Sequence, residues 1–296
     1  MADALVGFRP TIWSKNFIVN MDKALVYKNV VNTDYEGDIA GGARSVKINE
    51  LGDVTINSYS EDTNISVQNL TDAQKELVID QKKYFAFAID DVLKAQSNVT
   101  IMEKAMQKAA YNMADEVDQY IAGLWTDAGV ATSGMGDSSS ALDIYATSAG
   151  VDNLISLLTN AHRYLDEANA PTAGRWVVVP PWLHQYLKQA QIVDNTTGAM
   201  KGGDTSAFGN GFVGNMLGFN VFASNNVTNT SSSAMFRVMF GTPDAISFAG
   251  QITQIETARV ELQFGDMVKG LYVYGAKVVR PDHLLTAFLD PTGLTT

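Results

Sequence analysis

The chain reads TIMEKAMQKAAYNMADEVDQYIAGL from Thr100 to Leu124, and this stretch carries its strongest helical pattern. Apolar side chains recur there at steps of three or four residues, which places them on one face of an α-helix. We predict one helix from about 98 to 127, roughly 45 Å long at 1.5 Å per residue. Helices of globular proteins average ~11–12 residues, so this helix is expected to be unusually long.

Residues 44–90, immediately before the helix, alternate between apolar and polar side chains. Val46 and Ile48 show the period of two that is typical of β-strands, as do later pairs up to Ile89. We predict a long β-hairpin with a polar tip near 52–70. Because a two-stranded hairpin is at best marginally stable alone, it needs a partner surface in this chain or on another copy.

Residues 1–43 mix short apolar pieces with turn sequences, including a weak helical stripe between Trp13 and Val31. Such a segment buries little apolar surface by itself, so it too is expected to lie against something else.

After the helix and a Ser/Gly-rich loop at 133–140, the pattern becomes α/β. Amphipathic helices are predicted at 154–168 and 182–190, on either side of a short buried strand at 175–179. A Gly-rich loop is predicted at 198–218. Further strands are expected at 219–224, 235–240, 245–248, 260–264, 271–274, 277–279 and 284–289. The predicted fold class is α+β.

Composition excludes several functions. The 296 residues carry 21 basic and 32 acidic side chains, a formal net charge of −11, and no dense basic run, so binding DNA through clustered Lys and Arg is not expected. The chain has no Cys, which removes disulfides, thiolate metal sites and Cys nucleophiles. The N-terminus does not resemble a signal peptide, and no stretch reaches the ~18 apolar residues of a membrane span. We expect a soluble protein without membrane association.

Charged residues make up 18% of the chain, below the ~25% of ordinary soluble proteins. Surfaces poor in Lys and Glu resemble surfaces that partners cover. A β-rich protein with many polar turns has the same composition, and composition alone favours that second interpretation.

Two segments resemble cofactor- or metal-binding motifs, but each lacks residues or elements that the motif requires. Gly209–Gly214 matches G-x-G-x-x-G, but no buried strand precedes it and no acidic residue follows before Asp244. Asn32–Gly37 resembles half of a calcium loop, yet Ala43 stands where the bidentate Glu is required. No cofactor and no metal site is predicted.

Catalytic residues are equally hard to assign. The three histidines, His162, His184 and His283, lack metal-binding spacing, and no G-x-S-x-G elbow supports a Ser–His–Asp triad, which the sequence alone leaves open. Three carboxylates on the long helix are expected on a solvated face: Asp115, Glu116 and Asp118. No enzymatic activity is predicted.

Three phrases, in this order, resemble a known family. They are Arg175-Trp-Val-Val-Val-Pro-Pro-Trp-Leu, Gly211-Phe-Val-Gly-Asn-Met-Leu-Gly-Phe-Asn-Val-Phe-Ala-Ser-Asn-Asn, and Phe264-Gly-Asp-Met-Val-Lys-Gly-Leu-Tyr-Val-Tyr-Gly-Ala-Lys-Val-Val-Arg-Pro. Together with the order of arm, hairpin, long helix, α/β block and closing strands, they resemble the major capsid (coat) proteins of tailed double-stranded-DNA bacteriophages. Encapsulins and herpesvirus capsids share that shell fold.

The resemblance implies a division of the whole chain. It assigns 1–43 to an N-terminal arm, 44–90 to an extended loop, and 91–149 to a peripheral domain with a spine helix at about 98–127. An α/β axial domain follows at 150–250, and 251–296 returns to the β-rich peripheral domain.

The implied function is self-assembly of pentamers and hexamers into an icosahedral virion shell, made in the cytoplasm of a bacterial host. Scaffolding protein and portal are the partners implied during assembly, and double-stranded DNA is enclosed without sequence-specific binding. Contacts between subunits are expected at a set of charged residues: Arg44, Lys47, Asp80, Lys82, Lys83, Glu256, Arg259, Glu261 and Arg280.

Two alternatives remain at this point. One is an encapsulin-like cellular compartment, which differs by its cargo. The other belongs to a different class: a soluble α/β hydrolase whose triad the sequence does not reveal.

Overall fold

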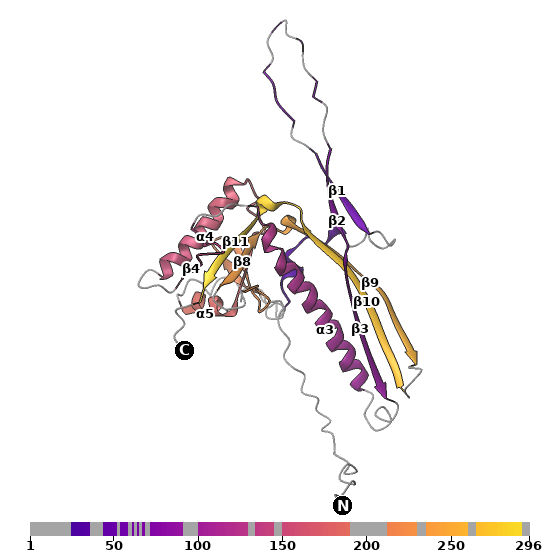
Figure 1. Cartoon of the computed structure of the whole chain (residues 1–296). Helices are drawn as coiled ribbons and strands as arrows, with labels where there is room; N and C mark the ends of the chain where they lie inside the picture. The colour runs from indigo at the N-terminus through magenta and orange to yellow at the C-terminus, as the bar shows by residue number, and fades with distance from the viewer. Residues whose placement is uncertain are drawn as a thin grey trace, which may run out of the picture.

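The computed structural model describes residues 25–35, 44–51, 54–58, 61, 64, 67–68, 72–90, 100–129, 134–144, 150–189, 212–229, 235–259 and 265–291. Figure 1 shows three parts: an α/β block, a long helix lying along a narrow sheet, and a two-stranded hairpin that projects away from both. The predicted α+β class is confirmed.

The α/β block is built on a six-stranded sheet with the order β4-β11-β8-β5-β7-β6. Its strands are β4 (Leu142–Asp143), β5 (Trp176–Val179), β6 (Phe212–Met216), β7 (Phe219–Ala223), β8 (Phe236–Gly241) and β11 (Leu284–Asp290). Two helices belong to the block, α4 (Gly150–Glu167) and α5 (Pro181–Gln189). β5 pairs in parallel with β7 and antiparallel with β8.

Both faces of this sheet are covered, and β5 shows how. Successive side chains of a strand point to opposite faces. Val177 and Val179 therefore join a core with Leu158 and other apolar residues of α4. Trp176 and Val178 join a second core on the other face. All four β5 side chains are buried, which explains the continuous apolar run in the sequence.

The second core brings together segments far apart in sequence. It contains residues of the short helix α1 (Tyr27–Val30), of the C-terminal end of α3 (Thr100–Ala122), and of β9 (Ile246–Arg259) and β10 (Gly265–Val278). Short 3-10 helices flank it: η3 (Gly123–Asp127), which continues α3, η6 (Pro243–Ala245) and η7 (Pro281–His283). The long predicted helix is present, and residues 98–99 lie outside the described residues.

The narrow sheet is antiparallel, with the order β3-β10-β9. β3 (Gln81–Asp90) pairs with β10 along its whole length, from Tyr274↔Gln81 to Gly265↔Asp90. The separate hairpin consists of β1 (Ser45–Leu51) and β2 (Asp72–Val78), in register from Ser45↔Val78 to Leu51↔Asp72.

Several boundaries differ from the sequence-based prediction. Residues 81–90 were expected in the hairpin, but they form β3 of the narrow sheet, where each of them pairs with a residue of β10. Leu284–Asp290, expected among the peripheral strands, pairs with β8 inside the α/β block. The Gly-rich loop ends earlier than predicted, since Phe212–Met216 pairs with β7 as β6. The strand expected at 260–264 and residues 1–24 of the arm lie outside the described residues.

Candidate assembly surfaces

The root of the hairpin packs on the narrow sheet. Val46, Leu77 and Ile79 form a small buried cluster with Ala249 of β9, and Ile48 lies against it. This cluster covers the near end of the hairpin's apolar face.

Two lysine side chains form hydrogen bonds that connect the hairpin with β10 and the residue after it. Lys75 of β2 donates from Nζ to the backbone carbonyl of Val279 at 2.7 Å. Lys277 of β10 donates from Nζ to the backbone carbonyl of Glu76 at 2.8 Å. Because each lysine binds the backbone of the opposing segment, the pair resists rotation of the hairpin about its root.

Gly275 of β10 allows the close approach at this root. A Cβ at this position would collide with the carbonyl oxygen of Val78 and lie 3.0 Å from the Cα of Ile79. The absence of a side chain at Gly275 therefore sets how closely the hairpin can sit on β10.

The far part of the hairpin presents apolar side chains to solvent. Val54 is 67% exposed, Ile56 95% and Val67 87%. Exposed apolar surface is typical of sites that a partner covers, so the far part of the hairpin is a candidate contact surface.

Asp118 of α3 is fully buried and holds α1 in place. Its Oδ1 accepts hydrogen bonds from the backbone N–H groups of Val26 (3.0 Å) and Tyr27 (2.7 Å). Its Oδ2 accepts from Nδ2 of Asn226, at 3.0 Å, in the segment that follows β7. One carboxylate thus joins the N-terminal segment, the long helix and the α/β block.

The expectation of a solvated carboxylate face on this helix was therefore wrong for Asp118. Burial raises the pKa of Asp118, while its hydrogen bonds from Asn226 and the backbone act in the opposite direction. Glu116 fits the expectation better, since its side chain is 51% exposed.

The predicted contact residues do not form one cluster. Lys83 of β3 pairs within the chain with Glu116 of α3, Nζ to Oε2, at 2.8 Å, which raises the pKa of Lys83. Lys82 is exposed beside it, and Asp80 accepts a hydrogen bond from Gln81. These three predicted residues lie together near the start of β3.

The remaining predicted residues lie on other elements. Glu256 of β9 pairs with Lys269 of β10 at 2.7 Å, and Arg259 faces Asp266 across the same strands. Arg280 lies 3.8 Å from Asp244.

On the hairpin, Lys47 faces Glu76 across the ladder, and the carbonyl of Arg44 accepts from the N–H of Ile79. Glu261 lies outside the described residues. A role between subunits stays a prediction for the whole set.

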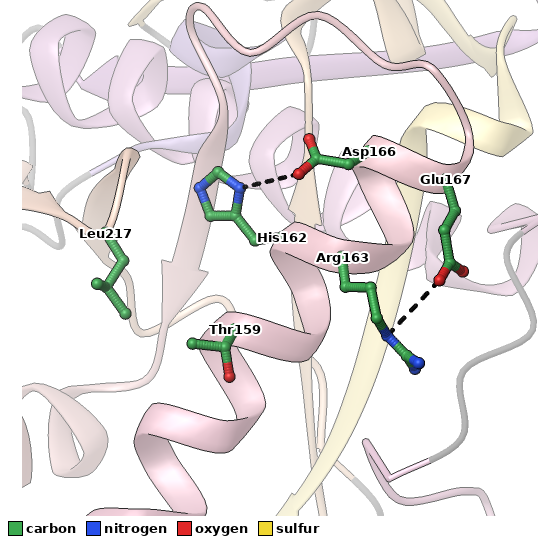
Figure 2. Close-up of a pocket in the computed structure, with 6 residues that line it drawn as sticks. All are labelled: Thr159, His162, Arg163, Asp166, Glu167 and Leu217. Atoms are coloured by element: carbon green, nitrogen blue, oxygen red, sulfur yellow. Dashed lines mark ion pairs between the residues drawn. The ribbon is translucent and has the colours of Figure 1, made fainter.

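A hollow of about 790 Å³ lies on α4 beside the turn between β6 and β7. Figure 2 shows the side chains that line it. His162 Nδ1 lies 3.9 Å from Asp166 Oδ2, and Arg163 Nε lies 3.8 Å from Glu167 Oε1. At the turn, Leu217 has φ 46° and Gly218 φ 81°, the pattern of a type I′ hairpin turn.

Arg175 holds two of these side chains, His162 and Asp166, in position. Its guanidinium is fully buried and donates to Asp166 at 2.6 Å, which lowers the pKa of that carboxyl. It also contacts His162 Nδ1 at 2.8 Å. Since a guanidinium only donates, Nδ1 accepts and the neutral ring carries its proton on Nε2. A catalytic triad needs Nδ1 as the donor to a carboxylate, so this histidine is arranged as a structural residue.

The described ranges contain no group of three His, Asp or Glu side chains placed to hold a metal ion. None of the described helices is both long and apolar enough to cross a membrane.

Comparison with known proteins identifies the family to which this chain belongs. A family model described as "Phage capsid protein" matches residues 74–287, which is well over half of the chain. The chain belongs to the phage capsid protein family. Members of such a family have a structural role in building shells, and the chain is a shell-forming coat protein of the virion. No curated protein matches it.

Solved structures agree over nearly the whole chain. The structure from Mycobacterium phage Che8 has a TM-score of 0.72 at 29% identity, covering 96% of this chain and 98% of that one. The capsid of Cyanophage P-SCSP1u has a TM-score of 0.68 at 17% identity, covering 95% and 93%. The mature capsid of bacteriophage PhiM1 has a TM-score of 0.64 at 11% identity, covering 95% and 92%. The last two show the fold alone.

The resemblance to tailed-phage coat proteins, with its fold, is thereby confirmed. Neither alternative, the encapsulin-like compartment or the α/β hydrolase, gains support from these comparisons.

Proposed function

We propose that this coat protein assembles as pentamers and hexamers of one icosahedral shell, in which each hairpin lies over a neighbouring subunit. The observation that carries the proposal is the far part of the hairpin, where Ile56 is 95% exposed although its apolar neighbours at the root are buried.

Burial of apolar surface supplies the driving force. Removing apolar surface from water stabilises by about 25 cal/mol per Å², and the same contact recurs at every copy of the subunit. Charged residues at subunit boundaries contribute less when exposed, so the predicted charged contacts would set orientation more than strength.

The shell is proposed to enclose double-stranded DNA without binding its sequence. The net charge of −11 supports this, because an acidic protein does not attract phosphates. Like-charged subunits also repel one another, so salt that shortens the screening length to ~8 Å at physiological strength is expected to favour assembly. Scaffolding protein and portal are the proposed assembly partners, and the bacterial cytoplasm is the proposed place of synthesis.

The proposed division of labour follows the sheets. The α/β block corresponds to the axial domain, the narrow sheet with α3 to the peripheral domain, β1 and β2 to the extended loop, and the N-terminal segment to the arm.

The test is to purify the protein and examine it by size-exclusion chromatography and negative-stain electron microscopy. The proposal expects closed hollow particles, with higher yield as salt increases. A folded monomer that stays monomeric at every concentration and salt would falsify it.

A further inference from the structure

Asn226 lies between two carboxylates of α3. Its side-chain nitrogen Nδ2 donates to Oδ1 of Asp115 at 2.7 Å and to Oδ2 of Asp118 at 3.0 Å. The two aspartates are three residues apart, so they are neighbours on the surface of the helix. An amide nitrogen carries two hydrogen atoms, and each carboxylate therefore receives one of them. We call Asp115, Asn226 and Asp118 the amide bridge.

The amide bridge has one orientation when both carboxylates are ionised. An ionised carboxylate only accepts hydrogen bonds, so Nδ2 of Asn226, and not its Oδ1, must face them. The other carboxylate oxygens are held as well. Oδ1 of Asp118 accepts from backbone N–H groups at the start of α1, and Oδ2 of Asp115 accepts from Nε2 of Gln119 at 2.9 Å. Asn226 and Asp118 are both buried, so a mismatch between them is not readily relieved by water.

A proton on Asp118 reverses the amide. Oδ1 of Asp118 already faces N–H groups, so the proton binds to Oδ2, where it points at Nδ2 of Asn226. Two donors then face each other, and a half-turn of the amide brings Oδ1 of Asn226 into place to accept from the new O–H group. After that rotation the same Oδ1 faces Asp115, which can donate to it only if it is protonated too.

We propose that the amide bridge is a two-state switch, which binds either no proton or two and reverses the Asn226 amide between these states. With a single proton, either two donors or two acceptors face each other in a buried site, and such unsatisfied groups are costly. The two protonations are therefore coupled. The bridge lies within one subunit, so this inference stands apart from the proposed function.

Titratable groups also approach the amide bridge from α1, α3 and β3. On α1, burial raises the pKa of Tyr27, which therefore stays protonated, and the ammonium group of Lys28 lies over an aromatic ring of β9. On α3, Glu116 pairs with Lys83 of β3 at 2.8 Å. Both lysines thus have partners outside the bridge, so the charge of the bridge is set by its own two carboxylates.

The direction of the pH effect follows from Asp118. Burial raises the pKa of Asp118 in the folded chain, so the folded subunit takes up this proton at a higher pH than the unfolded chain does. The protonated bridge therefore stabilises the subunit at pH values below the ordinary Asp pKa of about 3.9. This contribution is lost as the pH rises through the raised value. Acid is expected to hold α1 more tightly against α3.

Substitution of the carboxylates by amides tests the switch, because an asparagine supplies the donor that a protonated aspartate would supply. In Asp118→Asn, the new amide nitrogen faces Asn226, whose amide reverses and turns its oxygen toward the ionised Asp115. This variant should lower the urea midpoint of the subunit. Adding Asp115→Asn supplies the second donor and should restore most of the lost midpoint. Asp115→Asn alone should change the midpoint little, since its own amide can rotate to accept from Asn226.

The matched control is Asp118→Asn/Glu116→Gln, which also removes a neighbouring negative charge but leaves Asp115 ionised. It should not restore the midpoint. A second measurement lowers the pH from neutral to mildly acidic. The midpoint of Asp118→Asn should then rise relative to that of the double variant Asp118→Asn/Asp115→Asn, because Asp115 takes up a proton and donates to the reversed amide.

Additive losses in Asp118→Asn/Asp115→Asn overturn this inference, and so does equal restoration by Glu116→Gln, which would reflect charge alone. Should Asp118→Asn not fold by itself, a double variant that folds is the expected restoration, and a double variant that stays unfolded counts against the switch. Each of these negative results leaves the proposed function standing, because none of them concerns assembly.

Discussion

The α/β block and the hairpin solve the burial of apolar side chains in opposite ways. In the block, the sheet is covered on both faces, and residues such as Trp176 and Val177 are at most 1% exposed. In the hairpin, the apolar side chain of Val46 at the root is buried, whereas that of Ile56 in the far part lies in water. The block therefore buries its apolar side chains within its own chain, whereas the proposed function has a neighbouring subunit cover the far part of the hairpin.

The largest expected effect comes from opening the block. Phe240→Ala removes a buried ring from the core beneath α4, and large-to-small changes of this kind cost about 3–5 kcal/mol. Urea denaturation of the subunit should show this loss in the free energy of unfolding. Ile56→Ala is the contrasting variant: it should leave that free energy within about 0.5 kcal/mol but lower the particle yield. Equal losses of stability in both variants would contradict the comparison.

Substitution of Asp118 is expected to have the second-largest effect on the free energy of unfolding. Asp118→Ala leaves the N–H groups of Val26 and Tyr27 without their buried acceptor, and each unsatisfied group costs about 1–3 kcal/mol. Asp118→Asn keeps an acceptor oxygen and should lose less. Denaturant unfolding of both variants checks this order, and a smaller loss for Asp118→Ala than for Asp118→Asn would refute the assignment.

Gly275→Ala tests the root of the hairpin. The added methyl group collides with the backbone of Val78, and strain of this kind costs about 1–3 kcal/mol. The hairpin must shift, so particles are expected to be misshapen or variable in diameter by electron microscopy. Gly123→Ala is the control, because a Cβ there meets nothing within 4 Å. Uniform, normal particles from Gly275→Ala would show that the close approach does not matter.

Charge reversal at two lysines of β3 distinguishes an ion pair within the subunit from a predicted contact between subunits. Lys83→Glu places two negative charges where Lys83 and Glu116 now pair, so it should lower the urea midpoint of the subunit. Lys82→Glu leaves that pair intact, and it should reduce particle yield with an unchanged midpoint. Normal yield of closed particles from Lys82→Glu would remove this residue from the predicted contacts.

The smallest effect concerns pH. Arg175 lowers the pKa of Asp166 in the folded state, so the unfolded chain takes up the proton first as the pH falls. The pair therefore stabilises the subunit above the ordinary Asp pKa of about 3.9, and this contribution is lost as the pH falls further. Asp166→Asn should flatten the pH dependence of unfolding in that range, whereas an unchanged profile would argue against the pair.

Local patterns predicted the elements well and their partners poorly. The apolar steps along α3 and the continuous run of β5 identified both elements. The period of two in 81–90 correctly indicated a strand, but no local pattern reveals that its partner is β10, nearly two hundred residues later. For the same reason the last strand, β11, was grouped with its neighbours in sequence rather than with β8.

The sequence indicated the candidate assembly surfaces and the buried carboxylate only in part. Val54, Ile56 and Val67 stood out by alternation, yet their polar neighbours made the tip look solvated. Asp118 directly follows Val117 of the apolar stripe, which was a signal for burial. Its partners Tyr27 and Asn226 lie about a hundred residues away on either side, so only the folded chain shows why a carboxylate is there.

The most direct test of the account is a cryo-electron microscopy reconstruction of the assembled particle at side-chain resolution. The account predicts a closed shell in which the Ile56 face of each hairpin is buried against an adjacent subunit, while the α/β block keeps the structure of the single chain. A shell in which the far part of the hairpin stays exposed to solvent would contradict it.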